Sequence, residues 1–146
     1  MGFERLLLPT DGSAVSEPAE TRAIELAREW GASLDVVHVI EATALPLGEH
    51  REGLIETLEA EAGAFVNSVV RRAEDAGVAD VSGTVVRGKP YEAILDLVDE
   101  RGSDVIVMGT HGRAEHQPYV LGSVTARVLQ HTPIEVLVVP THQDRT

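Results

Sequence analysis

Apolar residues follow two spacings that alternate along the chain. Short aliphatic runs predict strands at residues 5–9, 34–40, 81–86, 105–108 and 135–139. Between them apolar residues recur three or four positions apart, as in Ala19, Ala23 and Ala27, which is typical of a helix that buries one face. This spacing predicts helices over residues 16–30, 54–77, 90–102 and 122–133. Strands joined by helices indicate a parallel sheet with helices on both faces.

The runs 5–9, 105–108 and 135–139 are almost wholly apolar, which is typical of strands buried on both faces. The length of 146 residues fits a single domain, residues 1–146, with an open α/β sheet of the Rossmann-like kind. In such sheets ligands bind beyond the carboxyl ends of the strands, at a topological switch point. We therefore expect function in the loops after the first and the fourth strand, at residues 9–13 and from Gly109 onward.

Composition excludes several classes of function. The chain has no cysteine, so it has no disulfide, thiolate metal site, iron–sulfur cluster or cysteine nucleophile. Its 24 acidic and 12 basic residues give a net charge of −12, which disfavours nucleic acid as a partner because phosphate binding needs Lys and Arg. The apolar runs are too short to span a bilayer, and the first residues lack the basic start of a signal peptide. These features predict a cytoplasmic protein with no nucleic-acid or membrane partner.

The acidic surplus comes with an unusual choice of basic residues, because Lys89 is the only lysine among the 12. Salt screens repulsion between like charges, so this composition favours a halophilic source over an ordinary acidic protein. We expect the melting temperature of the protein to rise from dilute buffer to molar KCl. Comparing chloride with sulfate separates charge screening from general salting-out. A melting temperature that stays constant in KCl would contradict the halophile hypothesis.

Three glycines lie in the segment that joins the fourth predicted strand to the last predicted helix. Gly109, Gly112 and Gly122 permit backbone angles and a close ligand approach that side chains prevent. Ser123 stands at the expected N-cap of the last helix, and a helix N-terminus attracts phosphate. Residues 105–131 carry two basic residues and one acidic residue, a net charge of +1 that leaves −13 for the remainder. The segment predicts an anion-binding loop. The alternative interpretation is that the glycines only form turns and that the serine only caps the last helix.

Other motifs of α/β proteins fit the sequence poorly. A phosphate-loop NTPase needs Gly-x4-Gly-Lys-Ser/Thr, and Lys89 lies in no such pattern. A dinucleotide-binding fold carries its glycines after the first strand, where Gly12 stands alone. No His-Glu-x-x-His pattern supports a zinc hydrolase. His38, which alternates with valines in a predicted strand, is interpreted as a hydrogen-bonded core residue.

Three segments together resemble the universal stress protein family, in its ATP-binding branch. The pattern Gly109-x2-Gly112-x9-Gly122-Ser123 is similar to that family's nucleotide-binding signature. The segment 9–13, Pro-Thr-Asp-Gly-Ser, resembles its opening motif, and residues 128–133 and 136–140 resemble its ending. The resemblance covers essentially the whole chain. It implies a five-stranded parallel sheet in the order 3-2-1-4-5, which is commonly dimeric.

The resemblance also implies a role for individual residues. It places Pro9, Thr10 and Asp11 against ribose or adenine, Val39 beside adenine, and Met108 and Gly109 along the nucleoside. It places Gly112, Arg113, Gly122, Ser123, Val124 and Thr125 around the phosphates. It assigns no metal-ligating residue. For Asp11, a structural role in capping the first helix or holding its turn is the alternative.

The function implied in this way is a nucleotide-binding stress-response or regulatory protein that holds ATP with Mg²⁺ and acts by binding rather than turnover. A slow ATP hydrolase or phosphotransferase, in which Asp11 or Glu115 orients water or metal, is one alternative. A dimeric interaction module that binds no nucleotide is the other. In the implied strand order residues 135–139 form an edge strand, and an open apolar edge favours pairing with its copy in a homodimer.

Overall fold

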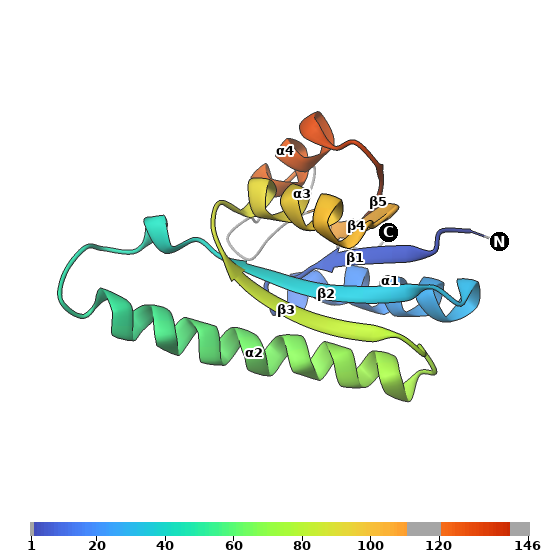
Figure 1. The fold of residues 1–146 in the computed structure, drawn as a ribbon, viewed down its shortest axis with the longest axis horizontal. Coiled ribbons are helices and arrows are strands. Elements are labelled where there is room, and N and C mark those ends of the chain that lie inside the picture. The colour runs from blue at the N-terminus through green and yellow to red at the C-terminus, as the bar shows by residue number, and fades with distance from the viewer. Residues whose placement is uncertain (1, 111–120, 141–146) are drawn as a thin grey trace, which may run out of the picture.

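The computed structural model describes residues 2–110 and 121–140, and these form the predicted alternation of strands and helices (Figure 1). The strands are β1 (Arg5–Pro9), β2 (Ser33–Ile40), β3 (Val81–Arg87), β4 (Val105–Gly109) and β5 (Glu135–Val139). The α-helices are α1 (Glu17–Trp30), α2 (Arg51–Asp75), α3 (Pro90–Arg101) and α4 (Ser123–His131), with 3-10 turns at Ala14–Ser16 and Ala42–Ala44. The strands are parallel in the order β3-β2-β1-β4-β5, which confirms the predicted fold class.

Glycines end α1 and α3 where the sequence predicted. Gly31 follows α1 with a φ of 63°, and Gly102 follows α3 with a φ of 68°. This left-handed conformation is accessible to glycine at little cost, so the chain can turn back into the next strand. The first helix differs from the prediction at its start, because a 3-10 turn at Ala14–Ser16 precedes Glu17.

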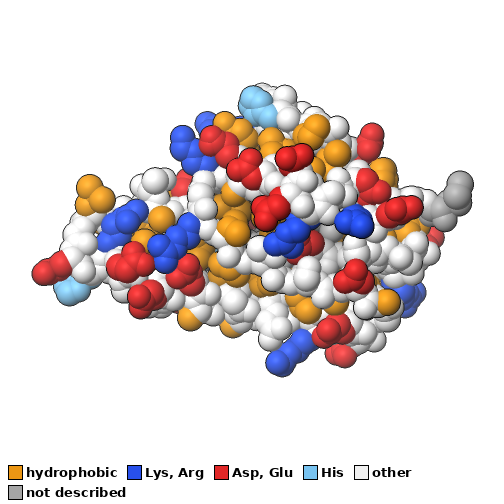
Figure 2. All heavy atoms as spheres, in the orientation of Figure 1, with side chains coloured by type: hydrophobic (Ala, Val, Ile, Leu, Met, Phe, Trp, Pro, Cys, Tyr) orange, Lys and Arg blue, Asp and Glu red, His pale blue; other side chains and the backbone are white. Residues whose placement is uncertain are grey.

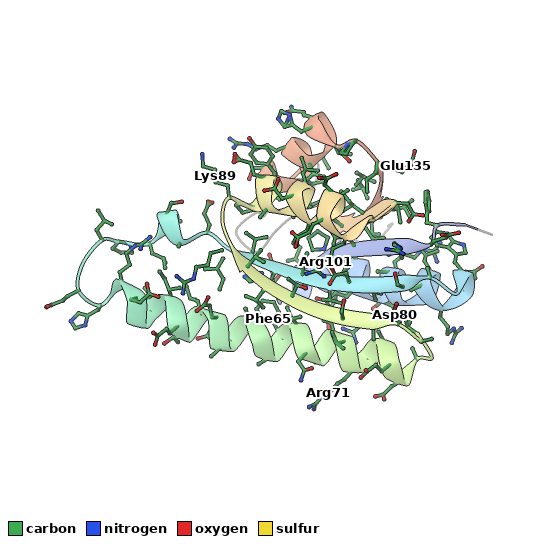
Figure 3. All side chains as sticks on the ribbon, in the orientation of Figure 1. Phe65, Arg71, Asp80, Lys89, Arg101 and Glu135 are labelled. Atoms are coloured by element: carbon green, nitrogen blue, oxygen red, sulfur yellow. The ribbon has the colours of Figure 1, made fainter. Side chains whose placement is uncertain are left out.

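Two apolar layers cover the sheet. Leu6 and Leu8 of β1 face α1 and α2, whereas Leu7 faces α3 and α4, because side chains alternate along a strand. From α2 the ring of Phe65 projects toward the sheet (Figure 3). Leu6–Leu8 of β1 and Val105–Met108 of β4 are buried, as predicted for strands covered on both faces, whereas Arg5 is exposed and Pro9 and Gly109 are half-buried.

The prediction that β5 is equally buried is wrong. Its residues 136–139 are only half-buried and Glu135 is exposed. The strand packs against both layers, but it is the last in the sheet and has a neighbouring strand on one side only. An edge position therefore explains why an almost wholly apolar run keeps partial exposure.

A buried ion pair joins α3 to β2. Nη1 of Arg101 donates to Oδ2 of Asp35 at 2.6 Å, and the hydroxyls of Ser82 and Thr84 donate to Oδ1 at 3.1 and 3.3 Å. Arg101 lies against β2 near the middle of the molecule (Figure 3). Burial raises the pKa of the Asp35 carboxyl, an effect larger than the lowering by Arg101 and the two hydroxyls. No pattern in the sequence indicated this pair, whose partners are 66 positions apart.

The charged surface is mixed. Figure 2 shows acidic side chains scattered over one face of the molecule with basic side chains between them, rather than gathered in a single patch. Across the described part of the chain, every helix falls short of the combined length and apolarity needed to cross a membrane.

The sheet opens at the carboxyl ends of its two central strands. β1 pairs with β2 over all of its length, but it pairs with β4 only at Leu6 and Leu7. After Pro9 the chain continues from β1 to α1 on one face of the sheet, whereas the helix that follows β4, α4, lies on the other face. This reversal is the topological switch point, and the crevice that it creates is where a ligand is expected.

Candidate functional site

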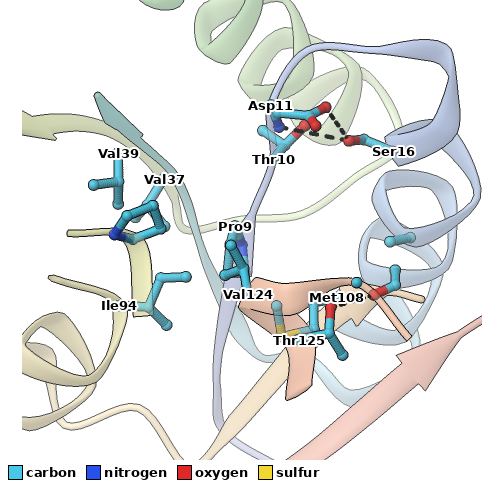
Figure 4. A pocket seen from close by; sticks show the side chains of 14 residues that line it. Pro9, Thr10, Asp11, Ser16, Val37, Val39, Ile94, Met108, Val124 and Thr125 are labelled. Atoms are coloured by element: carbon cyan, nitrogen blue, oxygen red, sulfur yellow. Dashed lines mark hydrogen bonds between the residues drawn. The ribbon is translucent and has the colours of Figure 1, made fainter. Parts of the chain in front are cut away.

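A cavity of about 160 Å³ occupies this crevice (Figure 4). It brings together segments from the first and the last thirds of the chain. The predicted site residues in its wall are Pro9, Thr10, Asp11, Val39, Met108, Gly109, Gly122, Val124 and Thr125. Ser123 lines an adjoining cavity instead. Gly112 and Arg113, also predicted, lie outside the described residues.

The cavity wall also includes residues that the sequence did not indicate as part of a site: Ser16, Ala19, Val37, Pro90 and Ile94. Val37 precedes Val39 by two positions on β2, so strand periodicity places both side chains on one face. Pro90 and Ile94 lie one helical turn apart on α3, which covers the same face of the sheet. Once Val39 was assigned to the site, strand and helix periodicity would have indicated Val37, Pro90 and Ile94 as further residues of its wall.

Asp11 holds the turn after β1. Its Oδ1 accepts hydrogen bonds from the backbone N–H of Ser13 at 3.0 Å and from the hydroxyls of Ser13 and Ser16, each at 2.6 Å. Figure 4 shows the bond to Ser16 from the side of the cavity. The next residue, Gly12, has a φ of +77°, and a Cβ there would lie 2.6 Å from the Phe65 ring. Asp11 thus has the structural role named as an alternative, in a loop that also lines the cavity.

Thr10 is fixed on both sides of the loop. Its backbone N–H donates to the Val37 carbonyl at 2.9 Å, and its own carbonyl lies 2.7 Å from Nδ1 of His38. A carbonyl only accepts, so Nδ1 carries the proton in this pair. The predicted hydrogen bonding of His38 is therefore present, but its side chain is half-buried and stacks edge-on against Phe65 rather than lying in the core.

The N-terminus of α4 forms the opposite wall. Gly122, not Ser123, is its N-cap residue, so the predicted capping role of Ser123 is wrong. Gly122 has a φ of −61° and a ψ of 152°, and its N–H donates to the Thr110 carbonyl at 2.6 Å. The Thr125 hydroxyl donates to the Gly109 carbonyl at 2.8 Å, which ties the first turn of α4 to the end of β4. A helix N-terminus presents backbone N–H groups and partial positive charge to whatever lies before it.

A second cavity, of about 300 Å³, adjoins the first between the N-termini of α3 and α4. Pro90 and Val124 line both cavities. The second one is also lined by two basic residues, Lys89 and Arg127, and by one acidic residue, Glu41. The Arg127 guanidinium lies 5.5 Å from the centre of the Tyr91 ring. The crevice is therefore apolar where β2 and α3 line it, and next to the start of α4 it carries one more basic than acidic residue.

Comparison with known proteins agrees with this architecture. The sequence profile of the Universal stress protein family matches residues 2–140. Universal stress protein MJ0531 of Methanocaldococcus jannaschii is 32% identical over 140 residues, which cover 94% of this chain and 82% of the relative. The solved structure of the protein MJ0577 superposes with a TM-score of 0.85 at 28% identity and covers 100% of both chains. A universal stress protein solved in complex with cAMP superposes with a TM-score of 0.74 at 28% identity, covering 97% of this chain and 100% of its own.

Proposed function

The chain belongs to the universal stress protein family, and we propose that this member is a regulatory protein that binds a nucleotide, ATP with Mg²⁺, and acts by binding rather than turnover. One observation carries the proposal. One cavity at the switch point is lined both by the opening segment Pro9–Asp11 and by the segments around Gly109 and Gly122. The opening segment precedes the other two by about 100 residues in the sequence. Their convergence is what a shared ligand requires.

The cavity offers each part of a nucleotide a suitable surface. Val39, Ile94 and Met108 supply apolar area for a base, and Asp11 supplies a carboxylate for ribose hydroxyls. The N-terminus of α4, with the basic residues of the adjoining cavity, favours phosphate. Mg²⁺ usually binds through phosphates, waters and one or two carboxylates, and Asp11 is the carboxylate in the described cavity wall. That a relative was solved with cAMP also supports a nucleotide as the class of ligand.

The geometry of Asp11 favours holding a ligand over hydrolysing it. Its Oδ1 already accepts three hydrogen bonds from Ser13 and Ser16. These bonds fix the orientation of the carboxylate, which suits a residue that shapes the loop and holds a ligand. A slow ATP hydrolase or phosphotransferase therefore stays the alternative, together with an interaction module that binds no nucleotide.

Two measurements test the proposal. Mass spectrometry of small molecules released from the purified protein identifies what co-purifies. Calorimetric titration then compares Mg·ATP with ADP, AMP and cAMP on nucleotide-free protein. We expect bound ATP and preference for Mg·ATP. Recovery of ADP or AMP from protein loaded with ATP would favour turnover, and the absence of any binding would favour the interaction module.

We also propose a homodimer that pairs through β5. The strand is half-buried and lies at the edge of the sheet, so its backbone is available for pairing along an apolar row, Val136–Val139. Two-fold symmetry would place the same strand of a second copy against it. We expect light scattering at micromolar concentration to give twice the mass of 15.7 kDa. A monomer mass over that range would contradict the proposal.

A further inference from the structure

Glu20 is a charged residue in an apolar position. It lies in the first turn of α1, on the face that packs against the sheet, between the buried residues Ala19 and Ala23. The residue is only 4% exposed. Acidic residues in a first turn stabilise a helix from the surface, which Glu17 already does. A buried carboxylate costs several kcal/mol unless it is paired and hydrogen-bonded, so its place here needs another reason.

Two contacts compensate the charge of Glu20. Nη1 of Arg72, on α2, donates to Oε1 at 3.0 Å, and Nη2 of the same residue donates to the Thr21 hydroxyl at 3.2 Å. The Thr10 hydroxyl donates to the other oxygen, Oε2, at 2.5 Å. Thr10 is itself buried and lines the candidate nucleotide cavity. Glu20 therefore connects the loop after β1 to both α1 and α2.

We propose that Glu20 is a positioning residue of the nucleotide site, acting through Thr10; the proposal rests on the function proposed above. An ionised carboxylate can only accept hydrogen bonds, so it takes the single proton of the Thr10 hydroxyl. The lone pairs of that hydroxyl then face the N–H of Gly12, which donates to it at 3.2 Å. This bond closes the turn around Asp11.

The closed turn matters because Asp11 lies between β1 and α1, where bonds within the loop, to Ser13 and Ser16 as well as those through Thr10, define its position. The bond from His38 holds the carbonyl of Thr10, and the bond to Glu20 holds its side chain. If the hydroxyl of Thr10 loses its acceptor, it is free to rotate and the Gly12 N–H loses a fixed partner. The Asp11 backbone then becomes less well defined in the cavity wall, and the ligand must order it on binding.

The test compares two substitutions of Glu20. Glu20→Gln keeps an oxygen that accepts the Thr10 hydroxyl, whereas Glu20→Leu removes it and keeps similar volume. We expect Glu20→Leu to weaken Mg·ATP binding about tenfold, a loss of about 1.4 kcal/mol, and Glu20→Gln to stay within about threefold of the wild type. Val105→Ala, at the amino end of β4 and away from the loop, supplies a control that loses stability without touching the site.

A double variant tests whether the effect passes through Thr10. If it does, Thr10→Val combined with Glu20→Leu weakens binding no more than the stronger single variant, because both remove the same hydrogen bond. Additive losses would overturn the proposal, as would an affinity loss in Val105→Ala equal to that in Glu20→Leu at matched stability.

Hydrogen exchange separates this proposal from the proposed function, because it needs no nucleotide. We expect the Gly12 amide to exchange at least about tenfold faster in Glu20→Leu than in Glu20→Gln. Equal exchange rates in the two variants would overturn the positioning role whatever the calorimetry gives. Faster exchange in Glu20→Leu with no Mg·ATP binding by the wild-type protein would overturn the proposed function, and with it the role of Glu20 in binding.

Discussion

Arg101→Met should destabilise the protein by about 2–4 kcal/mol at neutral pH, because it leaves the Asp35 carboxylate without its cation. Asp35 is 8% exposed, and its Oδ2 lies 2.6 Å from Nη1 of Arg101. Removing one partner of a buried pair leaves an uncompensated charge, which costs far more than the pair contributes. The Arg101 side chain is 36% exposed, so we place the loss below that for a fully enclosed pair. Urea unfolding of the wild type and of Arg101→Met measures this loss of stability.

The loss should depend on pH with a definite sign. Burial holds the pKa of Asp35 above its ordinary value of 3.8, and loss of the Arg101 charge raises it further. When folding raises the pKa of a carboxyl, ionisation of that carboxyl destabilises the folded state, so the cost is present only at a pH where it is ionised. The difference in unfolding free energy between wild type and Arg101→Met should therefore be small below pH 4 and increase as the pH rises to neutrality.

Arg87→Met is the matched control. Arg87 also contacts two carboxylates, Glu52 and Glu59, but on the surface between β3 and α2. Exposed ion pairs contribute little, so we expect a much smaller loss of stability. Equal losses for the two variants, or a loss for Arg101→Met that is the same at pH 4 and pH 7, would show that burial of Asp35 is not the cause.

The fold could be predicted because its main determinants are local. Apolar runs such as 105–108 and the helical spacing of Ala19, Ala23 and Ala27 each lie within one element, and parallel strands joined by helices restrict the topology. The burial of β5 could not be predicted in the same way. An apolar run does not say whether the strand has one neighbour or two, and this depends on the strand order.

The sequence indicated much of the cavity wall, including Val39, Met108 and Thr125, but not the contacts that hold the loops in place. The glycines and the segment 9–11 indicated two loops at the switch point, and the structure places both against one cavity. The side-chain contacts that hold the loop after β1 involve partners far apart in sequence, as with Glu20 and Arg72. In the sequence Glu20 is one acidic residue among 24, and only packing shows that it is buried.

Gly122→Val should lower the affinity for Mg·ATP tenfold or more, which corresponds to about 1.4 kcal/mol or more of lost contact. Gly122 is buried, lines the cavity and is the N-cap of α4. A branched side chain there would occupy the space next to the helix N-terminus, where a phosphate must come close to backbone N–H groups. Because its φ of −61° and ψ of 152° are accessible to valine, the variant should still fold.

Calorimetric titration with Mg·ATP measures the affinity of Gly122→Val, and circular dichroism verifies that the variant is folded. Ser123→Ala should weaken binding less than Gly122→Val, because the backbone donors at the start of α4 remain in place. Gly53→Val is the matched control, since a Cβ at that position of α2 meets nothing within 4 Å. It should bind as the wild type does. If Gly122→Val also binds as the wild type does, the phosphates do not lie at the start of α4, and the assignment of Gly122, Ser123 and Val124 to them is wrong.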